Sequence, residues 1–243
     1  MNIDEGRVRL NKRLADMGLA TRREADELIS RGLVYVNDAK AVLGMKVLPS
    51  DTVEIRTGKR ATPKERLYVA YNKPRGVITH SPQEGEEDIA SSLPTEFRNK
   101  GLFPVGRLDK DSYGLIILTN DGRITDRLLN PDAVHEKEYA VRTKFPLRKN
   151  FKERMEGGVD IEGYMTKPAK VRVTGERSFA ITLTEGKKHQ IRRMVVALFN
   201  EVTELKRSRV MNIRLGTLKP GEARIIEGKE LKEFLASLGL GAH

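Results

Sequence analysis

Residues 106–122 read GRLDKDSYGLIILTNDG, and this stretch decides how the rest of the chain is interpreted. Glycines and charged residues precede Leu115–Leu118, a short continuous apolar run that predicts a buried strand. Arg107 and Asp109 are two residues apart, so in an extended segment their side chains point the same way. An adjacent arginine keeps a carboxylate ionised, and such an aspartate can act as a nucleophile or general base. On these residues alone, the alternative is a charged turn with a surface ion pair.

A second segment combines a glycine-bearing loop with basic residues and a helix start. Residues 185–194 read EGKKHQIRRM, and from residue 186 to residue 224 there are 10 Lys and Arg against 3 Asp and Glu. A stripe of this kind can follow a phosphate backbone, whereas the common alternative for a charge run is a solvated helix face. The residues that we expect to contact RNA here are Lys187, Lys188, His189, Gln190, Arg193, Lys206 and Arg207.

A third segment, HEKEYAV at residues 135–141, places a tyrosine in a predicted strand. Tyr139 has two interpretations. A tyrosine in a strand usually packs half-buried against its neighbours. Its ring can instead form a flat face on which a nucleobase stacks, with the hydroxyl left for a hydrogen bond.

The N-terminal part of the chain predicts a small unit of two helices followed by short strands. Leu10, Leu14 and Met17 recur on one helical face, and Thr21 with Glu24 has the spacing of a capping box that begins a second helix. We expect this unit over residues 7–56. The candidate phosphate contacts near its second helix are Arg22, Arg23 and Arg31. Exposed charges that only keep the surface soluble are the alternative for them.

Residues 57–66 carry several charges and no apolar periodicity, which indicates a linker, and residues 67–243 form the second domain. In that domain strands and helices follow one another without a regular βαβ rhythm, so we predict an α+β fold. The expected strands include residues 67–72, 77–79, 115–118, 138–142 and 179–183. The expected helices cover residues 124–129, 189–199 and 229–238.

The composition favours a nucleic-acid partner. The 243 residues include 45 Lys and Arg against 34 Asp and Glu, a formal net charge of +11. A chain this basic suggests a polyanion, nucleic acid before membrane. No apolar run reaches the roughly 18 residues that a membrane span needs, and the N-terminus lacks the apolar stretch of a signal peptide. The absence of cysteine fits a reducing compartment, so we expect a cytoplasmic protein.

Several common kinds of site find no support in the sequence. The phosphate-binding patterns GxGxxG and GxxxxGK[ST] are both missing. The four histidines stand far apart and form no ligand-like cluster, so we expect neither a catalytic metal nor a cofactor.

Taken together, the segments at residues 106–122, 135–141 and 185–194 resemble the three motifs of bacterial ribosomal RNA pseudouridine synthases, in the family named for the small-subunit enzyme. The N-terminal string RLNKRLADMGLATRREADELISRGLVYVND resembles the S4-type RNA-binding domain that these enzymes carry. The resemblance spans nearly the whole chain in the family's order, and the motifs look closer to a large-subunit enzyme. It implies an S4-like module followed by a catalytic domain with a mixed, mainly antiparallel β-sheet and flanking helices.

The resemblance also implies roles for individual residues. Asp109 matches the essential aspartate of the family, whose carboxylate attacks the nucleotide or assists its fragmentation. Arg107 and Arg192 match basic residues that pair with this aspartate, and Tyr139 matches the tyrosine that stacks on the target base. Lys187 stands where the family often has arginine, which keeps the charge but loses the bidentate fork. The implied reaction needs no metal and no cofactor.

The implied substrate is a uridine in a stem-loop of ribosomal RNA, with 23S RNA favoured and transfer RNA as a further candidate, and we expect a monomer. A non-enzymatic RNA-binding or ribosome-associated factor is the alternative. Against it, such a factor would have no reason to keep Asp109 in a cleft meant for phosphates. A methyltransferase that uses S-adenosylmethionine would lack both its glycine-rich loop and the cysteine that methylation at C5 of uracil requires.

Overall fold

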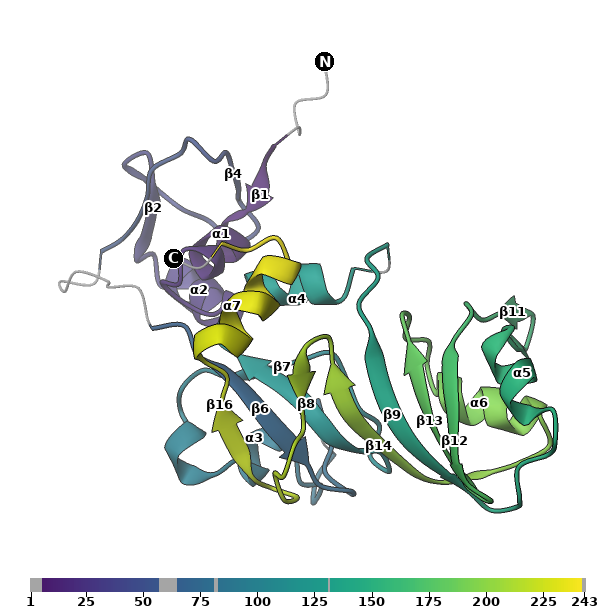
Figure 1. Cartoon of the computed structure of the whole chain (residues 1–243). Coiled ribbons are helices and arrows are strands. Elements are labelled where there is room, and N and C mark those ends of the chain that lie inside the picture. Colours follow the sequence, from purple (N-terminus) through teal and green to yellow (C-terminus); the bar gives the residue numbers. More distant parts are fainter. Residues whose placement is uncertain (1–5, 57–64, 81–82, 131, 242–243) are drawn as a thin grey trace.

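The computed structural model describes residues 6–56, 65–80, 83–130 and 132–241, and it contains a small N-terminal unit and a larger domain built on one extended sheet (Figure 1). Residues 57–64 of the predicted linker lie outside the described part of the chain. Within the described part, no helix is long and apolar enough to cross a membrane.

The N-terminal unit consists of two short helices and two small sheets. Its elements are β1 (Val8–Arg9), α1 (Leu10–Asp16), α2 (Arg22–Ser30), β2 (Val34–Val36), β3 (Ala39–Lys40), β4 (Lys46–Val47) and β5 (Val53–Ile55), with β1 paired to β4 and the order β3-β2-β5 in the other sheet. The predicted capping box is confirmed, because Thr21 and Glu24 exchange hydrogen bonds between side chain and backbone amide in both directions. The apolar core of this unit draws only on residues 8–55.

The larger domain is built on a nine-stranded sheet in the order β12-β13-β9-β14-β8-β6-β16, with β15 beside β14 and β7 beside β8. The strands are β6 (Tyr68–Lys73), β7 (Phe103–Val105), β8 (Tyr113–Thr119), β9 (Lys137–Thr143), β12 (Lys170–Gly175), β13 (Ser178–Leu183), β14 (Val202–Val210), β15 (Ile213–Arg214) and β16 (Ala223–Ile225). A separate hairpin pairs β10 (Asp160–Ile161) with β11 (Tyr164–Met165). Every pairing within the large sheet is antiparallel except the short parallel contact between β8 and β14. The predicted α+β class with a mixed, mainly antiparallel sheet is therefore confirmed.

Helices cover both faces of this sheet. They are α3 (Ile89–Ser92), α4 (Arg123–Leu128), α5 (Phe151–Glu156), α6 (Gln190–Ala197) and α7 (Gly228–Ser237), with a 3₁₀ turn at Thr95–Phe97. Apolar residues of α4 and α7 pack on one face of β6 and β8, whereas α3 and the 3₁₀ turn pack on the opposite face of the same strands. The helices α5 and α6 cover β9, β12 and β13. Tyr139 touches both this last cluster and that of α3, so the two clusters share a face.

The predicted strands and helices of this domain are confirmed to within a few residues, with one exception. Residues 77–79 do not continue β6, because the chain turns after Lys73 and Ile78 makes only an isolated bridge to Asp88. The structure also contains β14, which the sequence analysis treated only as part of a basic region. Its alternation of apolar and polar residues is interrupted by two bulges, one between Val202 and Glu204 and one between Arg207 and Arg209.

Polar contacts join the N-terminal unit to the larger domain. Lys12 of α1 forms an ion pair with Asp126 of α4. Arg66 donates a hydrogen bond from Nη2 to the carbonyl oxygen of Asp16 at 3.2 Å, and its Nε lies 3.8 Å from a carboxylate oxygen of Asp121. Charged groups therefore contribute to the contact between the two parts, and each part keeps an apolar core of its own.

Candidate active site

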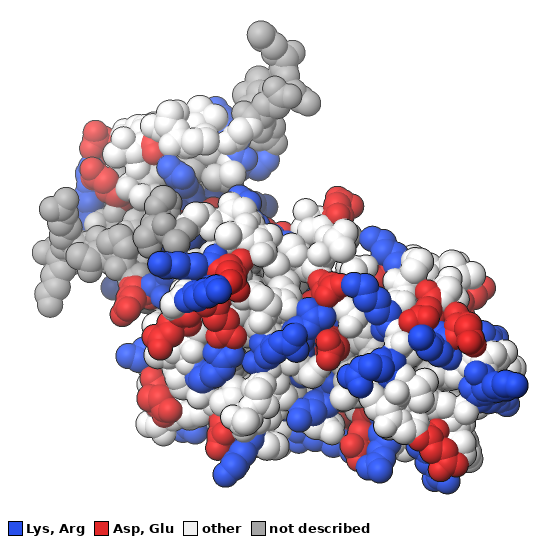
Figure 2. All heavy atoms as spheres, viewed as in Figure 1, with Lys and Arg blue, Asp and Glu red and all other residues white. Residues whose placement is uncertain are grey.

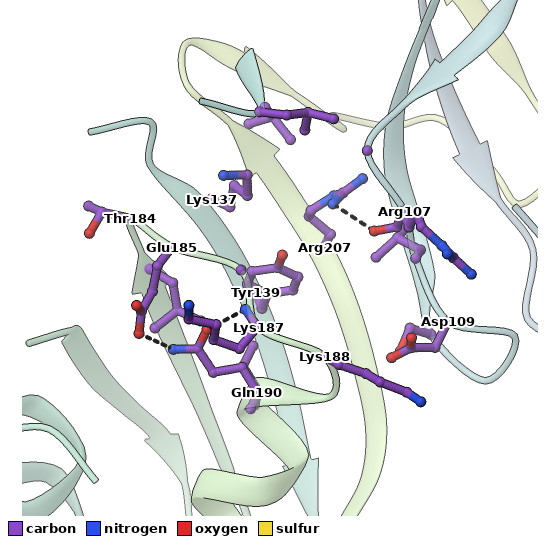
Figure 3. Close-up of a pocket in the computed structure, with 18 of the residues that line it drawn as sticks. Arg107, Asp109, Lys137, Tyr139, Thr184, Glu185, Lys187, Lys188, Gln190 and Arg207 are labelled. Carbon is purple, nitrogen blue, oxygen red and sulfur yellow. Dashed lines mark hydrogen bonds between the residues drawn. The ribbon is translucent and has the colours of Figure 1, made fainter. Parts of the chain in front are cut away.

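A pocket of about 890 Å³ opens along the line where β8 and β14 meet. Its walls come from the loop 106–112, from β9 and β14, and from the loop 184–189 that leads into α6 (Figure 3). The predicted site residues that line it are Arg107, Asp109, Tyr139, Lys187, Lys188, His189, Gln190 and Arg207. The chain thus brings its three unusual segments together at one place.

The loop that carries Asp109 is held by the segment 76–79. The Thr79 hydroxyl donates to the Leu108 carbonyl at 2.6 Å and accepts from the Leu108 amide at 3.1 Å, and the Gly76 amide donates to the Lys110 carbonyl at 2.8 Å. The segment 76–79, most of which was predicted to be a strand, therefore supports the loop through hydrogen bonds. Because both flanks of Asp109 are bonded to this segment, its backbone is held in place before any substrate arrives.

Lys73, the last residue of β6, is fully buried beneath the same loop. Its ammonium group donates to the carbonyls of Val77 at 2.6 Å and Pro74 at 3.0 Å, with the Lys110 carbonyl at 3.5 Å. Burial lowers the pKa of Lys73 to about 8, and the negative charge of Asp109 opposes this shift. Lys73 was not among the predicted site residues, although the sequence shows a lysine at the end of this largely apolar strand.

The nearest ionic partner of Asp109 is His189, whose Nε2 lies 3.4 Å from the carboxylate. Both side chains remain accessible from the pocket, at 42% for Asp109 and 47% for His189. His189 adopts a left-handed backbone conformation with φ of 52° immediately before α6, which aims the ring at the facing loop. His189 is therefore the residue of the loop 184–189 whose side chain approaches the Asp109 carboxylate.

The structure corrects the expected partners of Asp109. Among the described residues neither Arg107 nor Arg192 forms an ion pair with this carboxylate. Arg192 instead lies 3.3 Å from the Val202 carbonyl and 3.5 Å from the Ser112 hydroxyl. Arg107 extends away from Asp109 (Figure 3), and residues 107–109 lie outside any strand, so the extended segment that the residue spacing predicted is not formed.

Tyr139 lies on β9 directly across from Arg207 of β14 and lines the pocket between the two loops. The side chain is half-buried, and its ring packs against the apolar clusters beneath α3 and α6. Its hydroxyl makes no hydrogen bond with any other described residue. The ring thus packs against apolar neighbours and also lines the pocket, so packing is observed and stacking on a base stays a prediction.

The loop 184–189 takes its shape from Glu185, which accepts three hydrogen bonds. The donors are the Tyr164 hydroxyl at 2.6 Å, the Lys167 amide at 3.0 Å and the Gln190 side chain at 2.6 Å. Gln190 in turn accepts from the Lys187 amide at 2.9 Å and is buried. Both ends of the Gln190 amide are bonded within the protein, and its contact with RNA stays a prediction.

The expected basic stripe between residues 186 and 224 is also only partly present. Arg193 bonds to the Ile161 carbonyl and to Glu162, Arg209 pairs with two glutamates, and Arg207 is buried. Lys187 and Lys188 remain exposed at the pocket, and Lys206 is half-buried outside it. The face seen in Figure 2 likewise carries Lys and Arg interspersed with Asp and Glu. Arg207 is thus largely withdrawn from solvent and Arg193 joins the hairpin β10–β11 to α6, while phosphate contacts by these residues stay predictions.

The predicted phosphate contacts of the N-terminal unit, Arg22, Arg23 and Arg31, are all exposed on or beside α2. Arg23 lies near Glu27 one turn further along, with 3.6 Å between their charged atoms. The position of these residues is compatible with binding a phosphate backbone and with a solubilising role, so their function stays a prediction.

Within the described residues there is no group of three or more His, Asp and Glu side chains that could hold a metal ion. The chemistry that the pocket itself offers is that of a carboxylate beside an imidazole, an aromatic face, and several cations.

Comparison with protein families assigns both parts of the chain. The family model described as RNA pseudouridylate synthase matches residues 67–197, and that of the S4 domain matches residues 3–53. The first match includes the loop of Asp109, Tyr139 and the loop before α6.

Relatives along the whole chain carry the same description. The dual-specificity RNA pseudouridine synthase RluF of Escherichia coli (strain K12) is 39% identical over 232 residues, which cover 94% of this chain and 79% of that one. Ribosomal large subunit pseudouridine synthase B of Bacillus subtilis (strain 168) is 35% identical over 238 residues, 94% of this chain and 96% of that one. A crystal structure of a pseudouridylate synthase matches with a TM-score of 0.68 at 28% identity, covering 95% of this chain and 99% of that one. The chain belongs to the RNA pseudouridine synthase family, with an S4 domain ahead of its catalytic domain, and it is an isomerase.

Proposed function

We propose that this protein converts one uridine of 23S ribosomal RNA to pseudouridine, with Asp109 as the catalytic carboxylate. The observation that carries the proposal is the placement of this carboxylate: it is accessible in the pocket that Tyr139 also lines, on a loop held by hydrogen bonds to Thr79. The name of the Bacillus subtilis relative supports a large-subunit RNA. The name of the Escherichia coli relative gives two specificities, which keeps a transfer RNA as a second candidate substrate.

The proposed reaction rearranges bonds within one nucleotide. The bond between N1 of uracil and C1′ of ribose breaks with Asp109 acting on the nucleotide, the freed base rotates, and a bond forms between C5 and C1′. The proton on C5 is then lost and N1, which carries no proton in uridine, gains one, so the product is an isomer of the substrate. A stacked uracil is out of reach, so it must first leave the stack, which costs a few kcal/mol. The ring of Tyr139 offers the extruded base a replacement stacking partner.

We further propose that residues 7–56 act as a second RNA contact, joined through the linker 57–66 to a catalytic domain over residues 67–243. The exposed arginines beside α2 suit phosphate oxygens. The proposed substrate puts the reaction in the cytoplasm, where bacterial ribosomes are assembled, and we expect the protein to act as a monomer.

The test of the proposed function is to map pseudouridines in the ribosomal RNA of cells with and without the gene. We expect one pseudouridine of 23S RNA to disappear with the gene and to return when purified protein is added to the unmodified RNA. Loss of a site in 16S RNA would move the substrate to the small subunit. An unchanged map in all RNAs, with RNA binding intact, would favour a non-enzymatic factor.

Deleting residues 1–60 should leave a folded catalytic domain that binds RNA more weakly. Its apolar clusters contain no residue of the N-terminal unit, and an ion pair between Lys12 and Asp126 is among the contacts that join the two parts. Tethered modules gain about 10²–10⁴-fold in affinity, so we expect the dissociation constant to rise at least tenfold. Thermal unfolding and a titration with 23S fragments check this.

The matched control is the full chain with Arg22, Arg23 and Arg31 changed to glutamine, which should weaken binding without altering the domain interface. An insoluble truncated protein would show that the two parts depend on each other for folding. A soluble one with unchanged affinity would show that the N-terminal unit does not contact this RNA.

A further inference from the structure

Arg207 is a buried cation in the middle of the large sheet. It lies on β14 at the parallel junction, paired in register with Gly114 of β8 on one side and with Tyr139 of β9 on the other. The residue is only 4% exposed, and it lines the pocket. A guanidinium group at such a place needs bonding partners, because burying a charge without them is costly.

The partners of Arg207 are the two ends of the segment that carries Asp109. Its Nε donates to the Leu115 carbonyl at 2.7 Å, and its Nη1 donates to the Arg107 carbonyl at 3.4 Å. Figure 3 shows the contact with Arg107 across the pocket wall. The planar guanidinium of Arg207 therefore connects the start of the loop, at Arg107, to strand β8, at Leu115.

The neighbouring arginine on the same strand is bound differently. Arg209 pairs with Glu136 at 2.9 Å and with Glu138 at 3.3 Å. Arg207 has no carboxylate partner among the described residues, and its Nη2 bonds to none of them. Its positive charge is therefore not neutralised locally, and it adds to the effect of burial in lowering the pKa of Lys73 and Lys137. A buried charge without a carboxylate partner is costly to the fold, so stability alone gives little reason for an arginine here.

We propose that Arg207 is a positioning residue for the isomerisation: it clamps the loop 107–115 so that Asp109 stands where the reaction needs it. This inference rests on the proposed role of Asp109. A reacting group must be held to within about 0.5 Å, and a misplacement of about 1 Å can lower the rate about 10²-fold. The planar fork of arginine can bond two carbonyls at once, whereas the ammonium group of lysine is a single point of charge.

Gly114 is the second part of this clamp. Its φ is +103°, and a Cβ at this position would lie 2.4 Å from the Arg207 carbonyl oxygen and 2.8 Å from the Arg207 amide nitrogen. Both distances are to backbone atoms, which cannot move aside as a side chain can. The close approach of β8 to β14 that presents Arg207 to the loop therefore requires glycine here.

The experiment compares Arg207→Lys and Arg207→Met with the wild-type protein on a 23S RNA fragment that contains the target uridine. We expect kcat to fall about 10²-fold for Arg207→Lys, with KM within a few-fold of wild type, since the charge is kept and the clamp is lost. Arg207→Met should lose at least as much. Arg209→Met is the matched control, because it removes a largely buried arginine from the same strand outside the pocket, and it should lower the melting temperature but leave kcat within a few-fold.

Salt dependence separates the clamp from a phosphate contact. A lost phosphate contact would reduce the slope of log affinity against log salt by about 0.7–0.9, whereas we expect no change for Arg207→Lys. An unchanged kcat in Arg207→Lys, a rise in KM alone, or an equal loss of kcat in Arg209→Met would each overturn the proposal. A wild-type protein that does not act on 23S RNA would instead contradict the proposed function, so the two failures are distinguishable. Gly114→Ala, if it folds, should reproduce the kcat loss without touching the guanidinium.

Discussion

Replacing Asp109 with asparagine should abolish isomerisation while leaving RNA binding within a few-fold of wild type. Asparagine keeps the size and the hydrogen-bonding geometry of the side chain, so the contact with His189 can persist, but the negative charge is lost. We expect turnover to fall by about 10⁴-fold or more, the upper end of what one acid–base group contributes. Pseudouridine formation under multiple-turnover conditions measures the loss, and a filter-binding titration measures the affinity.

The matched control for this variant is Asp111→Asn. Asp111 is exposed on the same loop, two residues further on, and does not line the pocket, so its replacement removes the same charge without touching the site. We expect it to keep nearly full activity. Clear residual turnover in Asp109→Asn, or equal loss in both variants, would move the catalytic role away from this carboxylate.

Tyr139→Leu should eliminate activity in a protein that remains folded. Leucine can fill the apolar part of the position between the two clusters, but it offers no flat face to an extruded base. Stacking on an aromatic ring is worth about 1–3 kcal/mol per base in nucleic-acid complexes. Single-turnover kinetics together with thermal unfolding measure both effects in the same preparation.

Two further variants separate stacking from packing. Tyr139→Phe keeps the ring and removes a hydroxyl that bonds to no other described residue, so we expect it to fold normally and to retain much more activity than the leucine variant. Tyr113→Leu is the control outside the pocket, where the tyrosine hydroxyl meets Glu204 at 3.3 Å. A collapse of the melting temperature in Tyr139→Leu would show that packing is the main role of this ring.

Local patterns in the sequence were sufficient for most of the elements around the site. The capping box at Thr21 places the start of α2, and the apolar face of residues 189–199 places α6. These signals depend on residues three or four apart, whose interactions are complete within one helix. The apolar run of β8 is equally local. The motifs also predicted that Asp109 and Tyr139 belong to one site. Both residues line the same pocket, and their roles remain predictions.

Contiguous motifs in the sequence predicted the family and several residues that line the pocket, among them Asp109 and Tyr139, and the order of strand and helix patterns predicted the α+β class. What those residues contact depends on the folded structure. The bulge after Arg207 breaks the alternation of β14, so no local period shows that this arginine faces inward while Arg209 pairs with glutamates. Asp109 and His189, which lie together, are more than thirty positions apart in the sequence. Lys73 is likewise buried beneath a loop that comes more than thirty positions later. Burial and charge pairing depend on which strand or loop packs across from a residue, and a pattern read along the chain does not contain that neighbour.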